Sequence, residues 1–307
     1  MPIFLPEGLP AARTLRAEGI EVASIRGSDR GAAPALRIGL LNLMPDKPTA
    51  ETQIARLLGA GPRRVELTLL LPGSHAPGTT TSAGHLRAFY RPWPESSGRR
   101  FDGLVVTGAP VEALDFEAVT YWRELRRILD QAQAQGTATL AICWAAMAAL
   151  RHFHGVPKHV LAEKRSGVFR QRALRPDASL LRGIGAEFPA PVSRRAEVRA
   201  ADLPPRGVEV LAASAESGPC VAEDRALGFT AVFDHLEYDA GTLRAEFLRD
   251  IAAGHAAGPP SGYFPDGDPS HAPVATWRPC GLRLFGNWLA DVERRTCRER
   301  PRARLAA

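Results

Sequence analysis

The amino-acid sequence predicts an α/β protein whose open, mostly parallel sheet carries helices on both faces. Short apolar runs, of the kind that form buried parallel strands, alternate with helical segments along the chain. The connections between them are short and carry Gly or Pro, as is typical of doubly wound sheets. A chain of 307 residues with 45% hydrophobic composition is large enough to bury such a core.

The expected elements follow one another in a regular order. Residues 1–35 are predicted to form a lead-in with a helix at Leu9–Glu18 and a linker at Gly27–Pro34, where Gly, Ala and charged residues gather. The main domain covers residues 36–290, and a basic tail covers residues 291–307. In the main domain we expect strands at Leu36–Leu43, Val65–Leu71, Leu104–Thr107, Thr139–Ile142 and Phe229–Phe233, and helices at Thr49–Leu58, Glu117–Gln135, Trp144–His152, from about Ala240, and at Leu282–Arg294. The Pro- and Arg-rich residues 151–206 receive no assignment.

Charge and composition exclude several classes of function. The formal net charge of +6 comes largely from arginines in the tail, at positions 294, 295, 298, 300, 302 and 304. Nucleic-acid binding usually needs basic residues spread over a folded face with aromatic residues between them, so we expect no nucleic-acid partner. The first residues lack a basic region followed by an apolar run, and no apolar stretch is long enough to span a bilayer. We therefore expect no membrane partner.

The four cysteines, Cys143, Cys220, Cys280 and Cys297, lie far apart and form no C-x-x-C pair. This spacing is typical of neither a disulfide framework nor a zinc site, and it favours a reducing, cytoplasmic compartment. The segment His152-Phe153-His154 has no carboxylate or cysteine partner at ligand spacing. We expect no metal.

One cysteine stands where a nucleophile is expected. Cys143 follows the apolar run Thr139–Ile142 and precedes the helical run Trp144–His152. A thiol at a strand end and in the first turn of a helix feels the positive end of the helix dipole, which favours the thiolate form. Taken alone, Cys143 would be interpreted as a small buried hydrophobic residue. A second motif favours the catalytic interpretation.

That motif is His235-Leu236-Glu237, which follows the strand-like run Phe229–Phe233. Alternate residues on an extended chain share a face, so Glu237 is able to accept a hydrogen bond from one nitrogen of His235. The other nitrogen is then free to take a proton from a thiol or hydroxyl. Because the carboxyl ends of parallel strands meet at one edge of the sheet, Cys143, His235 and Thr107-Gly108-Ala109 are expected to gather there.

Further motifs extend this pattern over most of the chain. They are Leu41-Asn42-Leu43-Met44-Pro45, residues 101–110, Tyr121-Trp122, Ile142-Cys143-Trp144, Glu163-Lys164, Ser166-Gly167-Val168, His235, residues 237–240, Tyr263-Phe264-Pro265, Trp277-Arg278 and Asn287-Trp288-Leu289. On these residues the chain resembles, over roughly residues 1–290, the homoserine O-acyltransferases related to class I glutamine amidotransferases. The resemblance implies a flavodoxin-like core, a homodimer, and no bound cofactor or metal. It also implies transfer of an acyl group from a coenzyme A thioester to an amino-acid hydroxyl, by default in methionine or cysteine biosynthesis.

The resemblance also assigns roles to residues. Cys143 is expected to be the acylated nucleophile, His235 the general base and Glu237 its orienting partner. Backbone N–H groups, those of Trp144 and of Gly108 or Ala109, are expected to hold the oxyanion. Lys164, Ser193 and Arg249 fall where the family binds the amino-acid acceptor. A guanidinium such as that of Arg249 suits a carboxylate, to which it donates two parallel hydrogen bonds.

Glu112 occupies the position that the family links to the choice of acyl group. A carboxylate lining the acyl pocket would repel the distal carboxylate of a succinyl group and tolerate acetyl. Acetyl-CoA is therefore the expected co-substrate, with succinyl-CoA as the alternative. If Glu112 instead faces water in a loop, this preference has no physical basis.

Several departures from the family pattern lie near the expected site. Asp234 and Leu236 flank the base where Gly and Pro are usual, and Asp234 places a negative charge beside the imidazole, which favours its protonated form. Val192, Arg195 and Met147 replace a histidine, a tyrosine and a glutamine. These changes leave serine, or another hydroxy amino acid, as an alternative acceptor to homoserine.

Two other classes of function remain open. One is an inactive binding or regulatory module, against which the intact Cys143, His235 and Glu237 argue. The other is hydrolysis or glutamine amide transfer, because a Cys-His-Glu arrangement serves those reactions too. The presence of Lys164, Ser193 and Arg249 favours acyl transfer.

Overall fold

The computed structural model describes residues 2–25, 35–74, 80–93, 100–255 and 258–305, and the side chains up to residue 297. The expected linker Gly27–Pro34 lies outside these ranges. Within them, no helix combines the length and the apolar character needed to cross a membrane.

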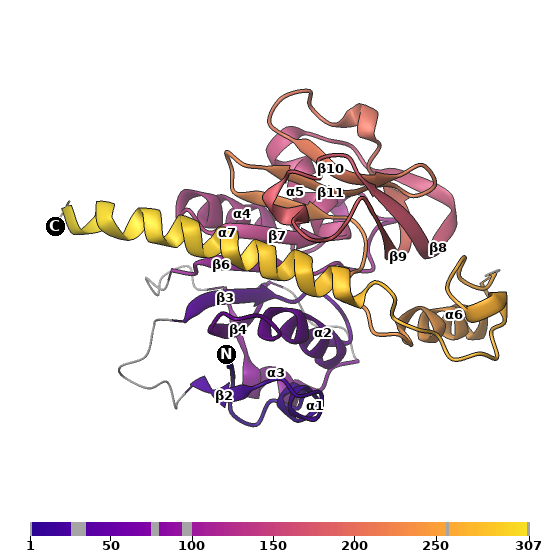
Figure 1. Ribbon diagram of the computed structural model, residues 1–307, viewed down its shortest axis with the longest axis horizontal. Helices are drawn as coiled ribbons and strands as arrows, with labels where there is room; N and C mark the ends of the chain where they lie inside the picture. Colours follow the sequence, from indigo (N-terminus) through magenta and orange to yellow (C-terminus); the bar gives the residue numbers. More distant parts are fainter. Residues whose placement is uncertain (1, 26–34, 75–79, 94–99, 256–257, 306–307) are drawn as a thin grey trace.

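One twelve-stranded sheet forms the centre of the molecule (Figure 1). Its strands are β1 (Ile3–Leu5), β2 (Val22–Ser24), β3 (Leu36–Leu41), β4 (Val65–Leu71), β5 (Tyr90–Pro92), β6 (Gly103–Val106), β7 (Ala138–Ile142), β8 (His159–Ala173), β9 (Glu187–Glu197), β10 (Glu209–Ser214), β11 (Gly218–Asp224) and β12 (Phe229–Val232). Their order is β2-β1-β4-β3-β6-β7-β12-β11-β10-β8-β9, with β5 beside β4. Pairing is parallel from β2 to β12 and antiparallel from β12 to β9.

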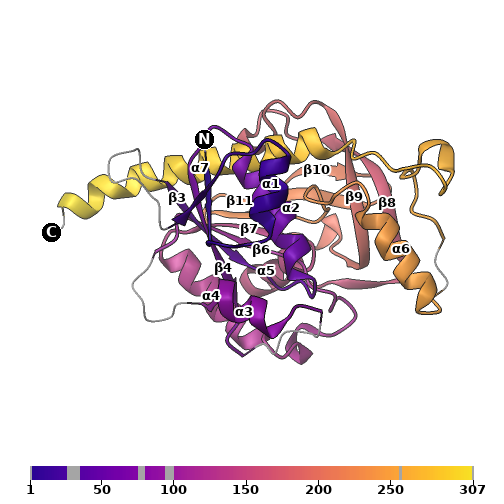
Figure 2. The same ribbon diagram turned by 90° about the horizontal axis from the view of Figure 1, so that it is seen from below.

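Helices cover both faces of the parallel part, as the sequence predicts. The helices are α1 (Ala11–Ala17), α2 (Lys47–Gly59), α3 (Ala83–Phe89), α4 (Trp122–Ala134), α5 (Trp144–His154), α6 (Thr242–Ala252) and α7 (Arg278–Leu305), with short 3-10 turns η2 (Phe116–Ala118), η3 (Ser179–Leu181), η4 (Ala200–Asp202) and η5 (Pro265–Gly267). Helices α1, α2 and α7 share one core with the sheet, and α4 and α5 share the other. Figure 2 shows α7 running along the molecule and α6 standing at its edge.

Alternation along each strand builds the two cores. On β3, Leu40 belongs to the α2 and α7 side and Leu41 to the α4 and α5 side. Neighbouring side chains on a strand point to opposite faces, so a strand that is buried on both faces is apolar throughout. This is why the apolar runs in the sequence predict the parallel strands well. The expected doubly wound α/β fold is confirmed.

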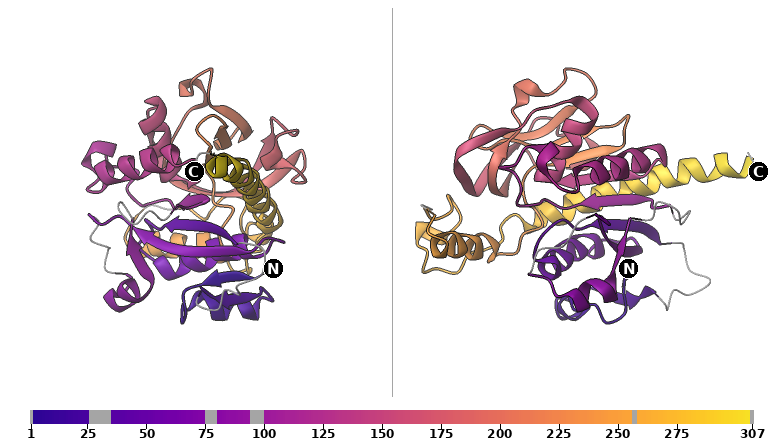
Figure 3. Two further views of the ribbon diagram at one scale, coloured as in Figure 1. Left: turned by 90° about the vertical axis from the view of Figure 1, so that its left-hand side faces the viewer. Right: turned by 180° about the vertical axis from the view of Figure 1, so that it is seen from behind.

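The two ends of the chain differ from the sequence-based description. Strands β1 and β2 pair at the edge of the sheet, with Ile3 beside Val65, so the first 24 residues add to the sheet rather than lead up to it. The last helix continues through the expected tail to Leu305, and its end projects beyond the body (Figure 3). Arginine is a good helix former, so this extension needs no core contact. The domain boundaries at residues 35 and 290 stay a prediction.

Candidate active site

Cys143 sits at a sharp turn between β7 and α5. Its backbone adopts φ 51° and ψ −115°, a conformation that side-chain-bearing residues rarely take. The N–H of Cys143 donates to the carbonyl of Val232 at 2.8 Å, which continues the β7–β12 pairing up to the turn. Strained backbone that the surrounding structure holds in place is concentrated at functional sites. The turn presents the thiol at the first turn of α5, as the sequence predicts.

Gly108 lies against this turn. A Cβ atom added at Gly108 would come within 3.2 Å of the Cβ of Cys143 and 3.8 Å of the backbone nitrogen of Trp144. The absence of a side chain therefore allows the two backbone segments to approach each other at the thiol. Ala109 follows in the same loop, and it lines a cavity together with Cys143. Trp144 is fully buried, and its backbone nitrogen is the part of it that lies against Gly108. The oxyanion role of these N–H groups stays a prediction.

His235 and Glu237 form the pair that the motif predicts. The Nδ1 atom of His235 lies 2.7 Å from Oε1 of Glu237, and both side chains are buried. The Tyr238 ring stacks on the imidazole, with centroids 4.2 Å apart and planes 17° from parallel. Although burial works against the charged ring, Glu237 and the Cys143 sulfur raise the pKa of His235 well above its ordinary value. His235 therefore interacts with both Glu237 and Cys143.

Three neighbouring elements hold the loop that carries His235. The N–H of His235 donates to the carbonyl of Pro191 on β9 at 2.7 Å. The indole N–H of Trp277 donates to the carbonyl of Tyr238 at 2.9 Å. A Cβ atom added at Gly281, on α7, would lie only 2.5 Å from the carbonyl oxygen of Leu236. A side chain at Gly281 would push α7 away from the loop, so the glycine is needed for this close contact.

Asp234, the charged residue next to the base, is paired rather than free. Its carboxylate accepts a hydrogen bond from Arg194 at 2.8 Å, and the two side chains are 0% and 2% exposed. Arg194 also donates to the carbonyls of Phe233 and Ser217. Burial raises the pKa of Asp234, and the charge of Arg194 opposes this. The negative charge expected beside the imidazole is therefore matched by a buried cation.

We expect Arg194→Met to lower the free energy of unfolding by about 3–5 kcal/mol, because it leaves the Asp234 carboxylate buried without its partner. The matched control is Arg170→Met, which removes an exposed arginine from the same β8–β9 hairpin, where it pairs with Glu187 at 2.8 Å. That change should cost at most about 1 kcal/mol. Urea unfolding of both variants checks the difference, and equal midpoints would contradict it.

Lys164 and Ser193, two of the predicted acceptor-binding residues, meet around a buried glutamate. Lys164 Nζ lies 3.2 Å from Glu246 and 2.8 Å from Asp250, and the Ser193 hydroxyl donates to Glu246. Tyr238 donates to the other carboxylate oxygen of Glu246 at 2.8 Å. Although burial opposes the charge, Lys164 and the hydrogen bonds hold the pKa of Glu246 below its ordinary value. A charged network therefore links Lys164 and Ser193 to the aromatic ring that stacks on His235.

Arg249, the third predicted acceptor-binding residue, is placed differently. It lies on α6 next to Asp250, to which it donates at 3.2 Å, and its side chain is 68% exposed. It lines both cavities beside His235 and contacts the network around Glu246 through Asp250, the partner of Lys164. Its role in acceptor binding stays a prediction.

One cavity of about 240 Å³ brings most of these residues together. The predicted residues that line it are Gly108, Ala109, Glu112, Cys143, Lys164, Ser193, His235 and Arg249. Glu237 lies behind His235 and lines an adjoining cavity of about 410 Å³, which shares Gly108, His235 and Glu246 with the first. The structure therefore unites residues from six separate parts of the chain at the carboxyl edge of the parallel strands.

The sequence did not point to Tyr238, Glu246 or Asp250 as members of the site. Glu246 and Asp250 are four residues apart on α6, a spacing that usually marks a solvated helix face. Only the packing of α6 against Lys164 shows that both face the cavity. Tyr238 follows the H-x-E motif directly, and this adjacency is the one signal that could have identified it.

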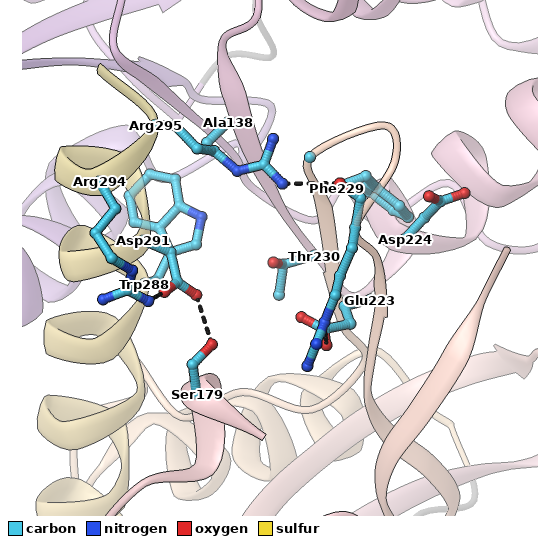
Figure 4. Close-up of a pocket in the computed structure, with 12 residues that line it drawn as sticks. Ala138, Ser179, Glu223, Asp224, Phe229, Thr230, Trp288, Asp291, Arg294 and Arg295 are labelled. Atoms are coloured by element: carbon cyan, nitrogen blue, oxygen red, sulfur yellow. Dashed lines mark hydrogen bonds and ion pairs between the residues drawn. The ribbon is translucent and has the colours of Figure 1, made fainter. Parts of the chain in front are cut away.

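A larger cavity, of about 780 Å³, lies at the opposite edge of the sheet (Figure 4). It sits between α7 and the first residues of β7 and β12, whereas Cys143 follows the last residue of β7. Several of its charged groups have partners within it: Asp291 interacts with Ser179 and Arg294, and Arg225 with Glu223. Among the described residues, no group of three or more His, Cys, Asp or Glu side chains could hold a metal ion.

The fold is shared with class I glutamine amidotransferases. A glutamine amidotransferase from Thermotoga maritima matches with a TM-score of 0.57 and 10% identity, covering 85% of this chain and 99% of that one. Another, from Methylobacillus flagellatus, matches with a TM-score of 0.54 and 13% identity, covering 84% and 95%. At these identities the likeness shows the fold alone. Fold and site together define a glutamine amidotransferase-like protein with a strand-end cysteine.

The sequence comparison is more specific. The chain belongs to the homoserine O-succinyltransferase family, whose model matches residues 2–298. It is 50% identical over 297 residues to a homoserine O-acetyltransferase of Novosphingobium aromaticivorans, covering 96% of this chain and 97% of that protein. It is also 50% identical to one of Rhizorhabdus wittichii, covering 96% and 92%, and 48% identical to one of Brucella canis, covering 96% and 97%. The resemblance that the sequence motifs indicated is confirmed.

Proposed function

We propose that the protein is a homoserine O-acetyltransferase that moves an acetyl group from acetyl-CoA, through a thioester on Cys143, to the side-chain hydroxyl of L-homoserine. The observation that supports this most is the single cavity that holds Cys143, His235 and the Lys164–Ser193–Glu246 network. The names of three relatives at 48–50% identity point to the same reaction.

The first half of the reaction begins with the pairing of Cys143 and His235. The Cys143 thiolate attacks the thioester carbonyl, and the backbone N–H groups near Gly108 and Trp144 stabilise the oxyanion. When the C–S bond to coenzyme A breaks, protonated His235 gives its proton to the departing thiolate. One thioester replaces another, so the exchange is close to thermoneutral and the acetyl group stays reactive towards an alcohol.

The second half uses the same histidine as a base. Acetylation removes the charge from the Cys143 sulfur, and with it one of the interactions that raise the pKa of His235. The neutral ring then accepts the proton of the homoserine hydroxyl as that oxygen attacks the acetyl carbonyl. Collapse of the tetrahedral intermediate releases O-acetylhomoserine and restores the Cys143 thiolate beside protonated His235.

Glu112 supports acetyl as the transferred group. The family carries the succinyl name, whereas the relatives named above carry the acetyl name. The Glu112 side chain is half-buried and lines the cavity that contains Cys143. Its carboxylate accepts a hydrogen bond from the backbone N–H of Arg195 at 3.4 Å. Its position in this cavity supports the proposal that its charge repels the distal carboxylate of a succinyl group.

We expect Glu112→Gln to raise the rate with succinyl-CoA relative to acetyl-CoA by about 10-fold or more, because it removes the repulsive charge and keeps the shape. The ratio of kcat/KM for the two donors measures this. The exposed Glu216→Gln change is the control and should leave the ratio unaltered. A ratio unchanged in Glu112→Gln would show that this carboxylate does not select the donor.

The direct test is to incubate the purified chain with acetyl-CoA and L-homoserine or L-serine, and to identify the product by mass spectrometry. Formation of O-acetylhomoserine supports the proposal. Exclusive formation of O-acetylserine would keep the mechanism and replace the acceptor. Absence of any product with either acceptor, from acetyl-CoA and also from succinyl-CoA, would favour an inactive binding module. Release of free acetate or of ammonia from glutamine would favour hydrolysis or amide transfer.

We also propose that the protein acts as a cytoplasmic homodimer, without a bound cofactor, in methionine biosynthesis. The family membership supports the pathway, and the far-spaced cysteines support a reducing compartment. Light scattering of the purified chain tests the homodimer.

A further inference from the structure

Three charged residues lie close together near the end of β9, and two of them have partners. Arg194 pairs with Asp234 at 2.8 Å, and Glu197 pairs with Arg165 at 2.7 Å. The guanidinium of Arg195 forms no hydrogen bond or ion pair with any residue in the described part of the chain. Yet the side chain is half-buried, and a cation partly removed from water without a partner costs free energy.

Arg195 lines the cavity that contains Cys143. Residues two apart on a strand share a face, so Arg195 lies on the same side of β9 as Ser193. Both side chains line the cavity together with Glu112. The hydrogen bond between Glu112 and the N–H of Arg195 joins this part of β9 to the loop that follows Gly108.

The other cations that line this cavity already have partners. Lys164 lies between Glu246 and Asp250, at 3.2 Å and 2.8 Å. Arg249 donates to Asp250 and is mostly exposed. Among the described residues that line the cavity, Arg195 is thus the one Lys or Arg side chain without a carboxylate partner.

We infer that Arg195 is the cation that binds a substrate carboxylate in this cavity, an inference that rests on the proposed acyl transfer. A guanidinium donates two parallel hydrogen bonds to a carboxylate. With an acetyl donor, the α-carboxylate of the amino-acid acceptor is the group that meets this description. The other substrate carboxylate that could bind here is the distal one of a dicarboxylic acyl group, and it would make the same hydrogen bonds to the Arg195 guanidinium.

The test compares the wild-type chain with Arg195→Met and Arg195→Lys. Each protein is assayed with three pairs of substrates. The first pair is acetyl-CoA and homoserine, and the second is acetyl-CoA and 3-aminopropan-1-ol, which is homoserine without its carboxylate. The third pair is succinyl-CoA and 3-aminopropan-1-ol. For Arg195→Met we expect kcat/KM for homoserine to fall by about 10- to 100-fold, as for the loss of a charge-assisted hydrogen bond. The rate with acetyl-CoA and 3-aminopropan-1-ol should stay within about 2-fold, which also shows that the variant is folded. Arg195→Lys should recover part of the loss.

The outcomes separate the two carboxylates and separate this inference from the proposed function. A loss confined to homoserine assigns Arg195 to the acceptor, and a loss confined to succinyl-CoA assigns it to the acyl group. Equal rates in all three assays, or equal losses in all three, would overturn the inference. If the wild-type chain acylates neither acceptor, the proposed function and the inference fail together; if it acylates both but Arg195→Met behaves like Arg170→Met, the inference alone fails.

Discussion

Replacing Cys143 with alanine is expected to lower acetyl transfer from acetyl-CoA to homoserine by at least about 10⁴-fold, since losing a nucleophile removes the covalent route altogether. Serine in the same place should rescue little, because its hydroxyl is a weaker nucleophile and would form an oxygen ester, which is less reactive than a thioester. Release of coenzyme A, followed with a thiol reagent, measures both variants. Alanine and serine both keep a Cβ at this strained position, so the comparison tests the sulfur.

The matched control is Cys297→Ala, which removes an exposed thiol on α7, outside both cavities around His235. That variant should retain the wild-type rate. If Cys143→Ala kept more than about a hundredth of the activity while Cys297→Ala lost it, the assignment of the nucleophile would be wrong.

Changing Glu237 to glutamine is expected to lower kcat/KM for homoserine by about 10²- to 10⁴-fold. The amide can donate to Nδ1 of His235, which would place the proton on the wrong nitrogen and leave Nε2 unable to act as a base in the way we propose. The exposed Glu216→Gln change again serves as the control. A loss below about 10-fold would show that the reaction does not depend on the 2.7 Å contact by which Glu237 orients the His235 ring.

The pH dependence of the same variant gives a second readout. Glu237 favours the protonated ring, so it raises the pKa of His235. The base in the second half of the reaction must be neutral, and the rate therefore rises with pH as His235 loses its proton. Removing the Glu237 charge lowers that pKa, and the acidic limb of the kcat/KM profile should move to lower pH. A limb that moves to higher pH would contradict this electrostatic role.

The positions of the expected catalytic residues could be predicted because parallel strands leave a clear pattern. Strands β7 and β12 are buried on both faces, so each appears as an apolar run, and the residue after each run lies at one edge of the sheet. Cys143 and the H-x-E motif follow those runs. The antiparallel half left no such pattern: β8 alternates irregularly between exposed, half-buried and buried residues, and its pairing with β9 carries a register shift.

The part of the site around the predicted acceptor-binding residues depends on contacts that no local pattern encodes. Glu246 and Lys164 are far apart in sequence, and each alone is typical of a solvated surface. Asp234 looked like an uncompensated charge next to the base until the structure placed Arg194 against it. Arg195 appeared only as a departure from the family pattern, whereas its unpaired guanidinium in the cavity supports a role in binding.

The most direct test of the proposed mechanism is intact-mass spectrometry of the purified chain mixed with acetyl-CoA alone, followed by addition of homoserine. We expect the mass to rise by one acetyl group, with the adduct mapped to Cys143 and absent from Cys143→Ala, and to return to the starting value when homoserine is added. Product formed without any acetylated chain, or an adduct on Cys143 that homoserine does not discharge, would contradict a thioester intermediate at this residue.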